Sequence, residues 1–585
     1  MNSTRRASVW PLVVATFFLG TTLGAGPSWA IETTIAGKSV RVNGFVESLN
    51  IFRSEDFNES PELTQNRNTA ELEVDIELLD NWGPFAFWTV FFDGRFFYDG
   101  VYDMNDNEFG NDAGGRLPGL PDQIPGFGPN RGFRLLGKPP LQFAVPVRPD
   151  DPRGKLSGYM ADDLDDLRYR FELREMYTDI EFQDVFGTGD NLFLRIGKQP
   201  IVWGRADLFR LLDVINPVDY GRHLFIEDYE LIRKPLWATQ VVWKFGPVGP
   251  FADLNLEFDW IWQEFEFADL GQGGAPYPVL GAGDFFRANK LLFDQGGFLF
   301  VDGQPIGIDP ATGTPLPFAF GGVAFPPGVV GVRSVHKPTN KLGNNQFGVR
   351  VEGVYGEVGF SLNYFHGRQQ LPSLRGLNPN FVPAGAIHFP TIEVLGGSAD
   401  WADPWTGSTW RFEFTRTHGE EFPNTLSPRL YKQSDTVRYL FGWDRPTFLR
   451  PLNPYRTFVF SGQAFFTHLI HHESKGSRRG MPDPDVNVVF TLLIQGFYMS
   501  DRIIPQIAQA YDYRGNGYLL LSNVQFIWTD HIDFTLGSNF FFGKQKKFDT
   551  LLGFPSEEPF GRFREGVISS FRDRHEFFFK VRYRF

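Results

Sequence analysis

The chain has 585 residues, no cysteine and a formal net charge of −13. The lack of cysteine excludes a disulfide framework and a thiolate metal site, and the acidic balance argues against nucleic acid as a partner. Phenylalanine is unusually frequent, with 64 residues beside 14 tryptophans and 18 tyrosines. Such a surplus of aromatic side chains is typical of a protein that must also cover an outer wall facing lipid.

The first 30 residues predict a secretory signal peptide. Arg5 and Arg6 precede an apolar stretch from Val9 to Leu23, and the small-x-small sequence Ser28-Trp29-Ala30 follows. This order predicts cleavage after Ala30, which leaves residues 31–585 as a single exported domain. No later stretch supplies the roughly 18 consecutive apolar residues that a spanning helix needs. The remaining way to span a membrane is a closed β-barrel, which pairs every backbone polar group within itself.

Runs of alternating apolar and polar residues predict the strands of such a barrel, since one side of each strand faces lipid and the other the lumen. In the clearest run, 69–80, residues such as Leu72 and Val74 share one face and four acids share the other. The predicted strands are 40–52, 69–80, 85–98, 172–182, 192–202, 236–245, 252–265, 345–354, 357–366, 391–400, 407–417, 434–443, 456–468, 486–499, 502–511, 517–529, 531–543 and 574–585. The fold class is therefore all-β, a transmembrane antiparallel β-barrel of about 16 to 18 strands.

The connections between these runs alternate between short and mostly long. Short periplasmic turns and long extracellular loops are the expected asymmetry of outer-membrane barrels, and an even strand count places both termini in the periplasm. The two longest loops, 99–171 and 266–344, are rich in Gly, Pro and Phe. Their aromatic content predicts that the long extracellular loops are partly folded inward, where they narrow the lumen.

The last strand carries the expected assembly signal. Every second residue is apolar and the chain stops on phenylalanine: Phe577, Phe579, Val581, Tyr583 and Phe585. This pattern resembles the signal that the barrel-assembly machinery recognises, so this machinery and the lipid of the Gram-negative outer membrane are the expected partners.

Residues 173–237 resemble a known family. They contain Leu173 to Asp179, the sequence RIGKQPIVWGRAD from Arg195 to Asp207, DVINPVD from Asp213 to Asp219, and RKPLW from Arg233 to Trp237. These blocks are similar to a proteobacterial family of predicted outer-membrane proteins with a domain of unknown function. The resemblance implies a link with RND-type exporters and with uptake or breakdown of hydrophobic compounds such as sterols, terpenes and aromatics. It implies a periplasmic carrier or an RND-type exporter as a further partner, and no catalytic residues or cofactor.

The same block predicts a constriction at the mouth of the barrel. Trp203 falls where an interfacial aromatic residue would lie, and Leu208, Leu211, Leu212 and Ile215 have helical spacing that predicts a short helix over 206–215. The candidate residues there are Trp203, Arg205, Asp207, Arg210 and Asp213. The helix either presents its charges to the path or packs on the rim with those charges in solvent.

Further candidate sites are electrostatic. Acids of one strand facing arginines of others predict a transverse field that selects permeants, although such groups also pair simply for stability. The candidates are Glu71, Glu73, Asp75, Glu77, Arg95, Arg195, Arg350 and Arg411. Asp103, Asn105 and Asn107 suit a weak calcium site, but the EF-hand pattern fails around them. No metal or cofactor is expected otherwise.

Three functions follow from this sequence. The first is an outer-membrane channel or facilitator for hydrophobic small molecules, gated by long loops. The second is a general or charge-selective aqueous porin, and the third is a surface adhesin or structural barrel. An enzyme is not expected, because no catalytic triad, phosphate loop or dinucleotide fingerprint is visible in the sequence.

Overall fold

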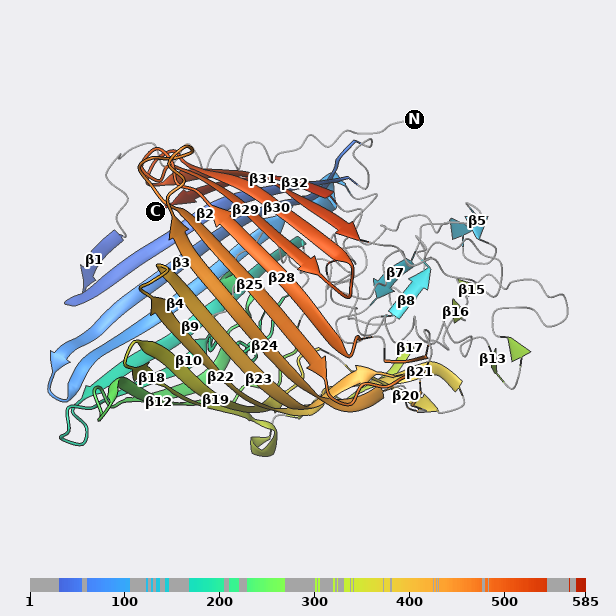
Figure 1. Ribbon diagram of the computed structural model, residues 1–585, viewed down its shortest axis with the longest axis horizontal. Coiled ribbons are helices and arrows are strands. Elements are labelled where there is room, and N and C mark those ends of the chain that lie inside the picture. The colour runs from blue at the N-terminus through green and yellow to red at the C-terminus, as the bar shows by residue number, and fades with distance from the viewer. Residues whose placement is uncertain are drawn as a thin grey trace.

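The computed structural model describes residues 31–54, 60–105, 168–204, 210–219, 229–268, 341–371, 389–424, 431–475, 483–543 and 575–585, with short pieces between them. Its main feature is a 19-stranded antiparallel sheet. All of these strands except β1 (Ile31–Ile35) form a closed ring, because the first strand of the ring, β2, also pairs with the last, β32. The chain is thus a closed antiparallel β-barrel (Figure 1).

The order of strands around the ring follows the chain. The strands are β2 (Lys38–Ser54), β3 (Glu62–Trp82), β4 (Phe85–Asp99), β9 (Tyr169–Gln183), β10 (Asn191–Gln199), β11 (Leu236–Lys244), β12 (Phe251–Ile261), β18 (Gln346–Tyr355), β19 (Val358–Arg368), β22 (Thr391–Asp403), β23 (Ser408–Pro423), β24 (Tyr431–Thr447), β25 (Phe458–Leu469), β28 (Val486–Gln495), β29 (Ile503–Asp512), β30 (Gly517–Ile527), β31 (Ile532–Gly543) and β32 (His575–Arg584). Each of the eighteen predicted runs corresponds to one of these strands, so the predicted fold class and strand number are confirmed.

Short elements occupy the connections. They are α2 (Val101–Met104), α4 (Tyr229–Ile232), the 3-10 helix η3 (Leu342–Asn344), β5 (Gln123–Ile124), β6 (Gly128–Pro129), β7 (Phe133–Leu136), β8 (Phe143–Pro146), β13 (Phe300–Val301), β14 (Gln304–Pro305), β15 (Ala319–Phe320), β16 (Val323–Ala324), β17 (Gly331–His336), β20 (Ser373–Asn378), β21 (Phe381–His388), β26 (Ser474–Lys475) and β27 (Arg479–Gly480). Within the described part of the chain, no helix has the length and apolar character to cross a membrane.

The two ends of the barrel differ. At one end, tight turns such as Gly83-Pro84 join neighbouring strands, and β1 and the C-terminus lie there. At the other end lie the small strands β7, β8, β15, β16 and β17, on the right of Figure 1. We call these the short-turn end and the long-loop end. Most of the two longest loops lies outside the described residues, so the prediction that these loops fold inward stays a prediction.

Alternation along the strands gives the wall two faces. The apolar side chains of Leu72, Phe258, Leu362, Leu395 and Phe441 are 37% exposed or more, as an outer wall in contact with lipid requires. Their immediate neighbours in sequence, such as Glu71 at 7% and Glu257 at 2%, point the other way and are buried. Charged residues in the position of Glu71 and Glu257 therefore line the lumen.

The seam between the first and last strands leaves no room at Gly44. The Gly44 amide donates to the Phe585 carbonyl oxygen at 3.1 Å, and the Phe585 amide donates to the Gly44 carbonyl oxygen at 3.0 Å. A Cβ atom on Gly44 would lie 2.6 Å from Cζ of the Phe585 ring, and it would also meet the Glu71 carbonyl oxygen. The terminal phenylalanine thus closes the ring over a position that only glycine fits.

We therefore expect Gly44→Ala to lower the yield of folded barrel and to destabilise it by about 1–3 kcal/mol, the usual cost of overpacking. The measurement is the heat-modifiable shift of the refolded protein on a gel. Gly462→Ala in β25 is the matched control, since its Cβ would meet nothing closer than 3.7 Å. Equal yields from the two variants would contradict the role of Gly44 in ring closure.

Candidate functional site

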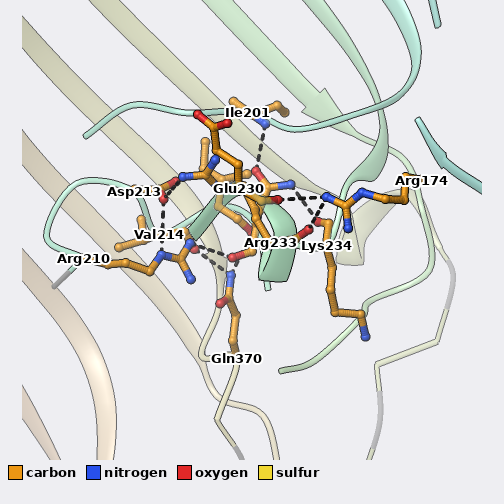
Figure 2. Close-up of polar contacts among 11 residues, drawn as sticks. Arg174, Ile201, Arg210, Asp213, Val214, Glu230, Arg233, Lys234 and Gln370 are labelled. Carbon is orange, nitrogen blue, oxygen red and sulfur yellow. Dashed lines mark hydrogen bonds and ion pairs between the residues drawn. The ribbon is translucent and has the colours of Figure 1, made fainter. Parts of the chain in front are cut away.

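The connection between β10 and β11 crosses the interior of the barrel. We call residues 200–235 the bridging segment, of which 200–204, 210–219 and 229–235 are described. One side of it is held by arginines of β4 and β9. Arg174 donates to the carbonyl oxygens of Leu231 at 2.9 Å and Glu230 at 2.8 Å (Figure 2). Arg95 donates to the carbonyl oxygen of Leu231 at 3.2 Å. These carbonyls belong to α4, so the guanidinium groups satisfy acceptors that a short helix leaves free at its C-terminal end.

Trp203 attaches the segment to the next part of the wall. Its indole Nε1 donates to Glu257 of β12 at 2.9 Å, and its ring meets Phe365 of β19 edge to face, with centroids 6.4 Å apart. The ring also lies over Gly348 of β18, where a Cβ would be 2.6 Å from Trp203 Cζ2. The side chain is only 4% exposed. The prediction of an interfacial aromatic is therefore wrong for Trp203, because its indole is buried on the luminal side, where Glu257 accepts its hydrogen bond.

The segment also reaches the opposite wall. Leu211 forms one buried cluster with Leu440 of β24 and Phe465 of β25, whose side chains share the luminal face. In the ring of eighteen strands, β4 and β24 are nine positions apart and therefore face each other across the lumen. A second buried cluster joins Leu212 and Ile215 to Ile392 and other luminal residues of β11, β12, β19 and β22. The bridging segment thus contacts opposite walls of the barrel.

An internal polar network gives the segment its shape. Asn216 accepts a hydrogen bond from the Ile201 amide at 2.8 Å and donates to the Lys234 carbonyl oxygen at 2.9 Å, which ties the two ends together. Asp213 forms ion pairs with Arg233 at 2.6 Å and with Arg210 at 3.4 Å. From outside the segment, Gln370 donates to the carbonyl oxygens of Val214 and Ile215 at 2.7 and 2.8 Å (Figure 2). Buried polar groups that are satisfied in this way favour one defined conformation.

The predicted helix over 206–215 is not present in its described part. Residues 210–215 form bends, and 205–209, which include Arg205 and Asp207, lie outside the described residues. Arg210 and Asp213 are not in solvent, because their side chains are 13% and 9% exposed and are paired with each other. The short helix of this connection is α4, which the apolar periodicity did not indicate.

Adding a side chain at Gly348 is expected to displace the indole of Trp203. In Gly348→Ala the new methyl group would overlap the indole, so the ring must shift and its hydrogen bond to Glu257 is lost. We expect the variant to be destabilised by about 1–3 kcal/mol, the cost of leaving the buried indole N–H without an acceptor, with more frequent channel openings. Urea titration and single-channel recording measure the two effects. Trp203→Phe, which removes the donor and part of the indole but introduces no clash with residue 348, separates loss of the hydrogen bond from forced displacement of the ring.

The predicted luminal arginines each pair with an acid on a neighbouring strand. Arg95 pairs with Glu71, and the other three pairs involve acids that the sequence analysis did not single out. These pairs are Arg195 with Asp179 at 2.7 Å, Arg350 with Glu257 at 3.0 Å and Arg411 with Asp444 at 2.8 Å. Asp179 and Glu257 lie in predicted strands, in phase with other polar residues, and the same alternation identifies them.

The remaining acids of β3 are arranged differently. Glu73, Asp75 and Glu77 share the luminal face with Glu71, yet none of them forms an ion pair among the described residues. Whether they select permeants by charge stays a prediction. The calcium hypothesis also stays untested, because Asn107 lies outside the described residues. Of the other two residues, Asp103 pairs with Arg168 at 2.5 Å and Asn105 donates to the Leu63 carbonyl oxygen at 2.9 Å.

A second connection also contributes to the interior. Ile568, between β31 and β32, is 1% exposed and belongs to a buried cluster with luminal residues of β29, β30 and β31. These residues are Ala508, Ala510, Leu519, Leu521 and Phe541. Part of the luminal wall is therefore apolar, and Ile568 packs against it.

A closed antiparallel barrel with an apolar outer wall and a charged interior defines the class of transmembrane β-barrels. The chain belongs to the family described as "Protein of unknown function (DUF1302)", whose model matches residues 16–585. A search of curated protein sequences found no match.

Solved structures of outer-membrane proteins align over most of the chain with low identity. OmpF of Salmonella typhi, solved in complex with daunomycin, is 6% identical and has a TM-score of 0.37, covering 95% of this chain and 100% of its own. OccAB1 of Acinetobacter baumannii is 8% identical with a TM-score of 0.40, covering 96% and 99%. OccK8 (OprE) of Pseudomonas aeruginosa is 8% identical with a TM-score of 0.40, covering 93% and 98%.

Proposed function

We propose that this protein is a channel of the Gram-negative outer membrane whose lumen is narrowed by the bridging segment. The observation that carries the proposal is that this segment contacts β4 and β9 on one side and β24 and β25 on the other. A barrel of about 18 strands is wide enough for an aqueous lumen when nothing fills it. A polypeptide across such a lumen restricts passage to small solutes that fit beside it.

Hydrophobic small molecules are the permeants that we favour. Support comes from apolar patches on the luminal face, where a general aqueous pore carries polar side chains. Leu49, Ile51 and Phe578 form one such patch across the seam, and the cluster around Phe541 forms another. The family resemblance points in the same direction. In this proposal the connections that cover the patches act as the gate.

A charge-selective aqueous porin is the second candidate. The acids Glu73, Asp75 and Glu77, without ion-pair partners among the described residues, favour it. Acidic side chains along a pore attract cations and repel anions. The two candidates differ in whether ions or apolar solutes cross more readily.

Single-channel recording of the refolded full chain in a planar bilayer, combined with uptake of an uncharged apolar dye by vesicles, tests the proposal. Rare, small openings with dye uptake support a gated path for hydrophobic molecules. A large, stable conductance with cation selectivity supports the aqueous porin instead. Neither conductance nor uptake would overturn the channel proposal and favour an adhesin or structural barrel. Protein-free vesicles of the same lipid serve as the control for leakage through the bilayer.

A further inference from the structure

Two aromatic rings face the lumen on the short-turn side of the bridging segment. Phe91 of β4 and Tyr177 of β9 are direct partners in the ladder, and their rings stack with centroids 5.1 Å apart. They lie on the same face as Asp93, which forms an ion pair with Arg174, and Arg174 in turn donates a hydrogen bond to the bridging segment. Both rings are partly exposed. Aromatic surface on the wall of a water-filled lumen is costly unless something covers it.

A row of carboxyl groups lies next to these rings on the same face, two residues further along β4 towards the long-loop end. Glu73, Asp93 and Glu175 are directly paired across β3, β4 and β9. Asp75 is the direct partner of Phe91 on its other side. Like charges directly opposite one another destabilise a sheet. Arg174 pairs with Asp93 at 3.5 Å, but Glu73, Asp75 and Glu175 have no ion pair among the described residues. The ring pair is thus bordered by more carboxyl groups than guanidinium groups.

The guanidinium group of Arg195 already packs against the ring of Tyr177. The guanidinium carbon of Arg195 lies 4.0 Å from the centroid of Tyr177, while Asp179 holds the same guanidinium through bonds of 2.7 and 2.8 Å. This geometry shows the chemistry that the wall accepts, namely a planar or alkylated cation on a ring face with a carboxylate at its edge. An anion would meet the carboxyl row, and a fully apolar molecule would leave that row unneutralised.

We propose that Phe91 and Tyr177, with Glu73, Asp75 and Glu175 around them, form a luminal binding site for small organic cations that carry an aromatic ring. The ring of the ligand stacks on Phe91 and its ammonium group approaches the carboxyl row, which offsets the repulsion within that row. This inference deepens the proposed function and rests on it, because the site lies in the lumen that permeants cross. It makes organic cations one class of solute that the channel retains or passes.

Isothermal titration of the refolded full chain with benzyltrimethylammonium tests the site. The probe has a permanent charge, and benzyl alcohol and benzenesulfonate are its neutral and anionic counterparts. We expect saturable binding of the cation alone. Tyr177→Leu and Phe91→Leu should each weaken it about two- to thirty-fold, the range of one cation–π contact. Glu73→Gln and Glu175→Gln should weaken it while preserving side-chain shape.

Matched controls separate this site from general electrostatics. Glu352→Gln removes a luminal carboxylate on β18 that already pairs with Arg350, and Tyr364→Leu removes a ring from the outer face of β19. Neither should change the affinity. Equal binding of benzyl alcohol, or equal losses in the control variants, would overturn the site. Binding by a barrel that never conducts would contradict the channel proposal but support the binding site. Conductance without binding would support the channel and contradict the binding site.

Discussion

Replacing most of the bridging segment with a short Gly-Ser linker from Pro200 to Pro235 is expected to raise the single-channel conductance several-fold. The segment contacts opposite walls through Leu231 and Leu211, so its removal opens the full cross-section of the barrel. A ring of about 18 strands without a plug encloses an aqueous channel. We expect long-lived, large openings, and sensitisation of cells to solutes that the intact protein excludes.

The deletion also exposes luminal apolar residues such as Phe365 and Val394, so folding must be checked by circular dichroism and heat modifiability. A matched control shortens 424–430, the connection between β23 and β24 at the same end, which should leave the conductance near that of the intact protein. A folded deletion variant with unchanged conductance would refute the idea that the bridging segment limits the lumen.

Arg174→Ala is expected to release one side of the bridging segment and to destabilise the barrel by about 3 kcal/mol. The Arg174 side chain is 8% exposed, pairs with Asp93 and donates to carbonyl oxygens of residues 230, 231 and 233. Removing one member of a buried ion pair leaves the other charge uncompensated, which usually costs about 3–5 kcal/mol; water in the lumen reduces this cost. The freed segment should produce fast, flickering openings in single-channel records.

Arg174→Lys and the double variant Arg174→Ala/Asp93→Asn distinguish the two roles of this arginine. Lysine keeps the charge beside Asp93 but lacks the planar fork that reaches several carbonyls, so it should restore stability more than it suppresses flicker. The double variant removes the uncompensated charge and should recover stability alone. If flicker disappears in the double variant, Asp93 rather than the carbonyl contacts controls the segment.

The strands were predictable because the signal is local. A strand with one face in lipid and the other in the lumen must alternate, and residues such as Leu72 beside Glu71 show this within a few positions. The strand boundaries moved by several residues at some ends; β3, for example, begins at Glu62, while the alternation was clear only from residue 69. Strand residues that extend beyond the lipid are paired by backbone hydrogen bonds but face water on both sides, so they need not alternate between apolar and polar.

The bridging segment was not predictable in the same way. Leu211 and Leu212 have helical spacing, but they are apolar because they contact different parts of the wall, β24 and β25 for the first and the cluster with Ile392 for the second. Trp203 resembled an interfacial residue because nothing in the local sequence reveals Glu257, 54 positions away. The polar partners Arg174 and Gln370 lie on other connections and strands, so only the three-dimensional structure shows what they hold.

Closure of the ring also bears on how the protein folds. Arg582 of β32 binds Glu47 of β2 across 535 positions of sequence, so the wall is completed only when the last strand is available. Loop-closure entropy makes such a distant contact a late event. The bridging segment contacts β9 on one side of the ring and β24 and β25 on the other. We expect these contacts to hold opposite walls together while the last strand docks, so the segment proposed to narrow the lumen would also assist closure of the ring.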